Sequence, residues 1–338
     1  MKKRFAQYWV ILEMLFSCVC QAEQPKSEYE SSPFTIPFND KENLTAEDYA
    51  KVQEEIRKID ITPTLERLYP YNHGYSEFDD FRRRTTKGIV QGIIDEKNGL
   101  LPETQLIKIG KGGDNCVVSK GSYNGKYAGF LSGIQKALED SGFNGYFLYQ
   151  RGGFPNPTGR ESKFVAVPYS FKIFMMLEAQ KLGFTKVLWI DSAALPMRDP
   201  TPIFELIDKD EKFVNYWGFK EDTWRYILPG TRQILLDETG YDANKERRVS
   251  MIIFGLKMNS PRTQKFIESY YKFVEMGTPF LSCYPEEYVI SALLSQPELG
   301  DFGKKSKLGH LIKIEESDSL KEKKKTQDKG FYFYLLPH

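Results

Sequence analysis

The pattern of apolar positions changes near residue 104. Before that point, apolar residues recur at helical spacing from Val52 to Ile59, behind a Thr45 that can cap a helix. After it, short apolar runs alternate with segments of helical periodicity, a pattern typical of a mostly parallel sheet flanked by helices. The pattern therefore predicts an α/β domain over residues 104–338, preceded by a linker and a helical extension over residues 23–103.

The same periodicity predicts the individual elements of the α/β domain. The strongest helix ends at Gly183, and its expected apolar face consists of Phe171, Met175, Ala179 and Leu182. Further helices are expected at 127–142, 202–207 (capped by Thr201), 260–277 and 285–296, and strands at 115–121, 146–150, 186–191, 212–219, 248–259, 310–314 and 331–336.

The apolar run from Lys186 to Ile190 ends on a carboxylate, Asp191. A continuous apolar run predicts a strand that is covered on both faces. In open α/β sheets, ligands bind beyond the carboxyl ends of such strands. A carboxylate there can hold a ribose hydroxyl, a divalent cation or a diphosphate-bound metal, although an ordinary turn residue also occurs at this position. Asp191 is therefore either a binding residue or a strand-end turn residue.

The first residues resemble a targeting segment. Three basic residues (2–4) precede an apolar stretch from Tyr8 to Cys20, and Ala22 offers a small residue for cleavage. Residues 1–22 are therefore expected to be a cleaved signal peptide or a short membrane anchor. The expected location is the secretory pathway, the periplasm or a membrane, and a cytoplasmic protein is the alternative.

Composition and charge narrow the class of partner. Apolar residues make up 41% of the chain and charged residues 28%, as in soluble globular proteins. The 47 Lys and Arg residues nearly balance the 46 Asp and Glu residues, so no overall basic field attracts nucleic acid. We therefore expect no nucleic-acid partner.

The order of motifs over residues 167–207 resembles the donor-binding half of glycosyltransferases of the GT-A fold. A Pro-Tyr pair precedes a helix, and "VLWID", small residues and "DPTPIFEL" follow it. Residues 250–273 resemble the acceptor-side strand and helix of that family, and residues 283–294 resemble a helix that carries acids near the reaction centre. The resemblance covers about 104–315. It implies a GT-A-like mixed sheet and transfer of a hexose-type sugar from a nucleotide-diphosphate donor to a hydroxyl of a glycan, lipid or protein.

The resemblance also suggests which residues bind the donor. Asp191 matches the first acid of the Asp-x-Asp motif of this family, followed by Ser192, and it is then a candidate ligand for Mn²⁺ or Mg²⁺. Ala193 stands where the second acid is usually the direct metal ligand, and an alanine side chain cannot coordinate a metal. The requirement for a divalent cation is therefore in question.

Other donor contacts follow from position in the same fold. Ser119 and Lys120 end the first strand, where the base and ribose are contacted. If no metal is bound, a cationic side chain has to neutralise the leaving diphosphate. Candidates for that role are Lys120, Arg151, Arg160, Lys172 and Arg198.

Carboxylates near the acceptor side are candidates for the catalytic base. These are Asp222, Glu286 and Glu287, and His310 is a candidate late metal ligand. Two alternatives to an active transferase stay open. One is a binding protein on the same scaffold that lost its chemistry with the second acid, and the other is an unrelated α/β nucleotidyltransferase.

Overall fold

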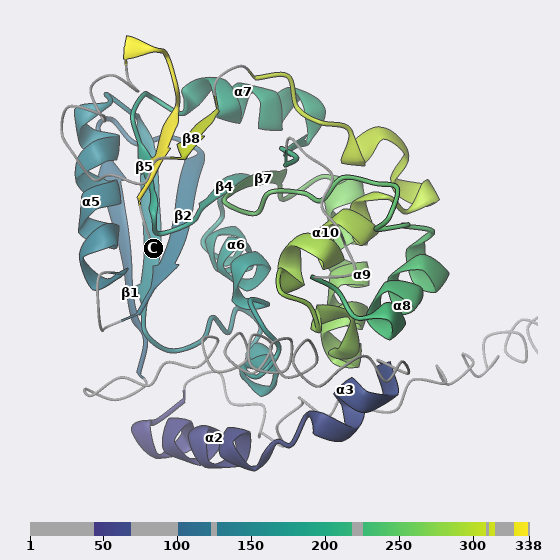
Figure 1. The fold of residues 1–338 in the computed structure, drawn as a ribbon. Coiled ribbons are helices and arrows are strands. Elements are labelled where there is room, and N and C mark those ends of the chain that lie inside the picture. The colour runs from purple at the N-terminus through teal and green to yellow at the C-terminus, as the bar shows by residue number, and fades with distance from the viewer. Residues whose placement is uncertain are drawn as a thin grey trace, which may run out of the picture.

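A six-stranded mixed sheet, in the order β1-β3-β2-β4-β7-β6, forms the centre of the molecule (Figure 1). In this computed structural model, the described residues are 44–68, 101–122, 127–217, 226–308, 311–314 and 328–336. The strands are β1 (Glu103–Ile109), β2 (Asn115–Gly121), β3 (Gly145–Arg151), β4 (Lys186–Ile190), β6 (Lys212–Phe213) and β7 (Ile253–Lys257). Strands β3, β2 and β4 are parallel, whereas β1, β7 and β6 each pair antiparallel with a neighbour. The expected α/β class with a mixed sheet is confirmed.

A second, smaller sheet lies beside the first. It has the order β5-β9-β8 and consists of β5 (Ala194–Pro196), β8 (Ile312–Ile314) and β9 (Phe333–Leu335). Because β5 follows β4 after only three residues, the turn at Asp191 connects the two sheets.

Helices and the small sheet cover the two faces of the central sheet (Figure 1). One face is covered by α6 (Phe171–Lys181), α9 (Pro261–Met276) and α10 (Pro285–Leu294), and α8 (Pro229–Thr239) packs on α10. The other face packs against α5 (Tyr127–Asp140), α7 (Thr201–Asp210) and the small sheet. Short 3-10 helices are η1 (Glu161–Phe164), η3 (Thr278–Phe280) and η4 (Pro297–Gly303).

The N-terminal helices α2 (Ala46–Lys58) and α3 (Thr62–Leu68) pack on the same core as α6 and α9. Their buried side chains, among them Val52 and Leu65, belong to that core cluster. The expected cap is confirmed, since the Thr45 side chain accepts a hydrogen bond from the Asp48 backbone and the Asp48 side chain bonds back to Thr45.

Several helix and strand ends follow from local chemistry. Ser260 caps α9 by accepting a hydrogen bond from the Thr263 backbone, and Gly277 ends the helix with a φ of 67°. Thr201 was expected to be a cap, but it is the first helical residue of α7. The cap position is held by Pro200, without a side-chain cap hydrogen bond, and Asp199 Oδ1 before it accepts hydrogen bonds from the Thr201 backbone (2.9 Å) and hydroxyl (2.7 Å).

Some expectations about elements were wrong in extent or face, and one strand was missed. Among the described residues of the expected ranges 212–219 and 248–259, regular strand is confined to Lys212–Phe213 and Ile253–Lys257, and residues 218–219 lie outside the described residues. Helix α6 is buried on nearly all sides and has no single apolar face, while Leu182, expected to be buried, is 53% exposed just beyond its end. Strand β1 was not predicted, because it is a largely exposed edge strand without clean alternation of apolar residues.

In the part of the chain that the structure describes, no helix is both long and apolar enough to cross a membrane. The expected targeting segment, residues 1–22, lies outside the described residues.

Candidate functional site

Asp191 lies at the carboxyl end of β4, in the turn that leads to the small sheet. Its backbone is fixed by two hydrogen bonds, from its N–H to the Ile252 carbonyl (2.8 Å) and from the Ala194 N–H to its own carbonyl (2.8 Å). Its side chain is 29% exposed. The main chain is thus held rigidly while the carboxylate reaches the surface.

The ammonium group of Lys172 lies behind Asp191, in the first turn of α6. Lys172 Nζ is 3.4 Å from Asp191 Oδ2, 2.6 Å from Glu286 Oε1 and 3.3 Å from the Met251 carbonyl oxygen. The rings of Tyr169 and Trp189 each have their centroid 5.6 Å from the same nitrogen. We call these five partners of the buried Lys172 ammonium the Lys172 cage.

Electrostatics keep this lysine charged. Burial by itself would lower the pKa of Lys172, but the neighbouring carboxylates of Glu286 and Asp191 outweigh it, and the pKa lies above its ordinary value. Because two carboxylates face one ammonium, the cluster carries one net negative charge.

A second ion pair lies next to the first, because Glu287 follows Glu286 in the first turn of α10. Glu287 pairs with Arg248 and accepts hydrogen bonds from the Trp217 indole N–H (3.0 Å) and the Met251 backbone N–H (3.0 Å). The guanidinium of Arg248 also lies 3.7 Å from the centroid of the Tyr284 ring. Both adjacent acids of α10 are therefore buried and bound to cations.

Strand β2 brings Ser119 and Lys120 to the same edge of the sheet as Asp191. Val118 pairs with Trp189, so Lys120 and Asp191 each lie two residues beyond this pair. Lys120 Nζ is 4.9 Å from the centroid of the Phe171 ring on α6. Ser119 is fully buried, and its hydroxyl has no hydrogen-bond partner among the described residues.

The residues after Asp191 turn away from this edge. Ser192 is buried, and Ala193 is 0% exposed within the apolar cluster of the opposite face, which includes Phe333 of β9. The carbonyl of Ala193 accepts a hydrogen bond from the Leu336 N–H (2.8 Å). Position 193 thus serves the contact between β5 and β9.

The residues present do not fit a metal site of the Asp-x-Asp type. Ala193 has no ligand atom and is enclosed by apolar side chains, and Asp191 Oδ2 is paired with Lys172. Within the described residues, no group of three or more His, Cys, Asp or Glu side chains could hold a metal ion.

The structure does not gather the remaining candidates at Asp191. Arg151 pairs with Glu103 (3.5 Å), and Arg198 donates a hydrogen bond to the Gly330 carbonyl (3.0 Å). Arg160 is exposed and precedes η1. Asp222 and His310 lie outside the described residues.

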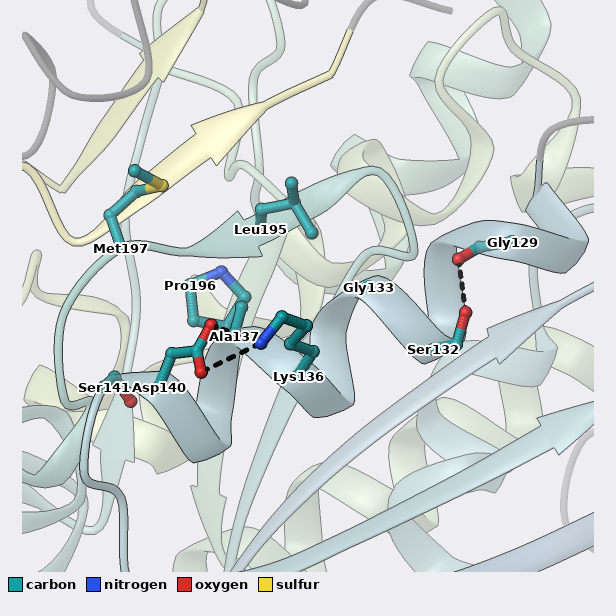
Figure 2. A pocket seen from close by; sticks show the side chains of 10 residues that line it. All are labelled: Gly129, Ser132, Gly133, Lys136, Ala137, Asp140, Ser141, Leu195, Pro196 and Met197. Carbon is teal, nitrogen blue, oxygen red and sulfur yellow. Dashed lines mark hydrogen bonds and ion pairs between the residues drawn. The ribbon is translucent and has the colours of Figure 1, made fainter. Parts of the chain in front are cut away.

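A separate groove of about 630 Å³ lies between α5 and β5 (Figure 2). Small residues of α5, such as Gly133 and Ala137, form one wall, and Leu195, Pro196 and Met197 form the other. Its charged side chains, Lys136 and Asp140, pair with each other at 3.0 Å. The charged groups that line the groove are therefore paired with each other, and they do not form a candidate catalytic site.

Comparison with known proteins gives no further assignment. No protein-family model matches the sequence, and no curated protein is significantly similar to it.

Sequence reasoning missed Arg248, Trp217 and the Met251 carbonyl. Trp217 and Met251 lie within the ranges of expected strands, and no sequence pattern indicated that they donate hydrogen bonds to Glu287 of α10. A backbone carbonyl gives no signal in a sequence, and a pairing across 79 positions, as between Lys172 and Met251, leaves no local pattern.

Proposed function

We propose that the chain is a glycosyltransferase of the GT-A fold that moves a hexose-type sugar from a nucleotide-diphosphate donor to a hydroxyl of a glycan, lipid or protein. The observation that carries the proposal is the placement of Asp191. A partly exposed carboxylate follows strand β4, which is buried from Val187 to Ile190, on a backbone fixed by two hydrogen bonds. Open α/β sheets bind their ligands at this edge.

In this proposal, Asp191 accepts hydrogen bonds from hydroxyls of the donor ribose or sugar. Lys172 positions Asp191, because its ammonium pairs with Oδ2, while Oδ1 accepts only a long hydrogen bond (3.5 Å) from the Ala193 N–H and can accept another from a ligand. Lys120 contacts the nucleotide from the end of β2, at the same edge of the sheet, whereas Ser119, the other expected contact, is fully buried and does not reach it.

Glu286 and Glu287 take a different role from the one first expected. Both carboxylates are buried and paired with Lys172 and Arg248, so in this proposal they hold these cations in place instead of accepting a proton from the acceptor. Among the three sequence candidates, Asp222 is then the remaining one for the catalytic base.

A specific observation favours a second candidate, a binding protein on this scaffold without transferase activity. The second acid is replaced by Ala193, which is fully buried in an apolar cluster. Such a protein would bind a nucleotide sugar at Asp191 and would not turn it over.

The test is the thermal stability of the full chain with UDP, GDP and their hexose conjugates. A ligand at about one hundred times its Kd adds about 2.7 kcal/mol of stability, which raises Tm by about 4 °C for a chain of this size. Asp191→Asn should weaken binding about tenfold or more, because a hydrogen bond to a charged group is worth about 1.5–3 kcal/mol. The exposed Asp237→Asn on α8 is the matched control and should change nothing.

The outcomes separate the candidates. Stabilisation by a nucleotide sugar, together with release of nucleoside diphosphate on incubation with it, supports the transferase. Stabilisation without release supports the binding protein. If no nucleotide shifts Tm, or if Asp191→Asn binds as tightly as the wild type, Asp191 is not a donor contact and the proposal fails.

A further inference from the structure

We propose that the Lys172 ammonium is a built-in cation at Asp191, and that ligands bind beside this carboxylate without a divalent metal ion. The inference concerns the same site as the proposed function and rests on it only for the identity of the ligand. The cage itself can be tested with no nucleotide present.

The oxygen atoms around Lys172 are those that a divalent cation would use. Two carboxylate oxygens, Asp191 Oδ2 and Glu286 Oε1, and one backbone carbonyl, that of Met251, surround the nitrogen at 2.6–3.4 Å. Mn²⁺ and Mg²⁺ sites are commonly built from one or two carboxylates, carbonyl oxygens and waters. An ammonium group has three N–H donors, and here three oxygens receive them. The lysine therefore satisfies the oxygens that a metal would otherwise bind.

The other walls of the cage suit an organic cation better than a hydrated metal ion. The rings of Tyr169 and Trp189 lie 5.6 Å from the nitrogen, at cation–π distance. Tyr169 has a φ of 59°, an uncommon backbone conformation for a residue other than glycine. This conformation places the ring of Tyr169 beside the ammonium group at the start of α6.

Position 193, where the Asp-x-Asp motif has its second acid, offers no compensating ligand. Ala193 faces the apolar cluster of the opposite side of the sheet, and its carbonyl is bonded to the Leu336 N–H. A metal at this edge would have to compete with Lys172 for Asp191 and Glu286, since both carboxylates are already paired with it.

The experiment measures binding of Mn²⁺ alone, by the loss of the electron paramagnetic resonance signal of free Mn²⁺. The wild type should show no binding that depends on Asp191, so its titration should match that of Asp191→Asn. Lys172→Met removes the charge and keeps an unbranched side chain of similar length. We expect this variant to gain one Mn²⁺ site with a Kd of about 1 mM or below, as in weak carboxylate sites, and to gain thermal stability as Mn²⁺ is added.

Lys212→Met is the matched control. Lys212 is as buried as Lys172, but its ammonium donates a hydrogen bond to the Lys304 carbonyl at 2.8 Å and forms no ion pair with a carboxylate of the described residues. Loss of this lysine should therefore create no metal site. Circular dichroism shows whether each variant is folded. If Lys172→Met does not fold, Lys172→Gln, which keeps both carboxylates of the cage and a polar end group beside them, replaces it in the titration.

Two results would overturn the inference. The first is Mn²⁺ binding by the wild type that Asp191→Asn abolishes, because the site would then take a metal in the presence of Lys172. The second is a folded Lys172→Met that binds no more Mn²⁺ than Lys212→Met, because the oxygens of the cage would then not form a cation site. Neither result depends on whether the protein binds a nucleotide sugar.

Discussion

Ala193→Asp places a carboxyl group where the Asp-x-Asp motif has its second acid. A motif-based view expects this change to restore a metal ligand. The structure predicts a loss of stability instead, because Ala193 is fully buried and its side chain lies in an apolar cluster with Ile190 and Phe333. The Lys172 ammonium cannot pair with the new carboxyl group, because Lys172 belongs to α6, on the other face of the sheet.

The size of the loss follows from desolvation and volume. A carboxyl group buried among apolar side chains remains protonated, and keeping it so at pH 7 against an unfolded-state pKa near 3.9 costs up to about 4 kcal/mol. The added atoms in a filled core cost about 1–3 kcal/mol more. We therefore expect Ala193→Asp to lower the free energy of unfolding by about 3–6 kcal/mol at pH 7.

Urea unfolding of the wild type, Ala193→Asp and Ala193→Asn measures this loss. The asparagine variant has nearly the same volume without a titratable group, so it isolates the steric part. The folded-state pKa of the introduced carboxyl is raised above its unfolded value. The carboxyl group of Ala193→Asp therefore costs no stability through its titration below the unfolded pKa, and this cost grows as pH rises from about 4 toward 7. The gap between the two variants should widen over that range.

The reasoning would be refuted by an Ala193→Asp variant that is as stable as the wild type at pH 7. It would also be refuted if Mn²⁺ stabilised Ala193→Asp but did not stabilise Ala193→Asn. Either result would mean that the side chain at position 193 reaches the edge of the sheet where Asp191 lies.

Two further predictions concern single side chains away from the site. Burial, with a smaller effect of Glu246, raises the pKa of Tyr216 from 10 to about 12, so the stability it confers is present below pH 10 and is lost as pH rises through 12. Between pH 10 and pH 12, the free energy of unfolding of the wild type should fall by about 2–3 kcal/mol more than that of Tyr216→Phe. Parallel pH profiles of the two proteins would contradict this. Glu211 ends α7 with a φ of 63° and pairs with Arg262. Glu211→Gly and Glu211→Ala both remove the pair, but only glycine relieves the backbone, so the glycine variant should be the more stable by about 1 kcal/mol; equal stabilities would show that the backbone is not strained.

The sequence predicted those elements whose signals are local. Strand β4 is a continuous apolar run, and α9 has a serine cap, an early proline and a terminal glycine, so both were found with nearly correct ends. Strand β1 has no such signal, since an edge strand that is exposed on both faces does not need alternating apolar residues.

Helix α6 shows where periodicity alone is misleading. Its sequence suggested one apolar face ending at Leu182, but β4, α9 and the loop before it enclose the helix, so charged Lys172 and apolar Met176 are both buried. The neighbours that enclose a helix come from distant parts of the chain. Their effect on burial cannot be read from the spacing of residues in the helix itself.

The Lys172 cage and Ala193 lie on opposite faces of the sheet, and both bear on whether Asp191 belongs to a metal site that has lost one of its ligands. If position 193 had merely lost an acid from a metal site, Asp191 and Glu286 would remain as two neighbouring carboxylates without a counterion, an arrangement that is costly when buried. Both instead share one ammonium as their counterion, and that ammonium also donates a hydrogen bond to the Met251 carbonyl. Ala193 packs where β5 meets β9, and Lys172 pairs with Asp191 and Glu286, so the contacts made by each residue account for its presence. A site assembled in this way requires no second acid, and the absence of the Asp-x-Asp motif is therefore a weak argument against ligand binding at Asp191.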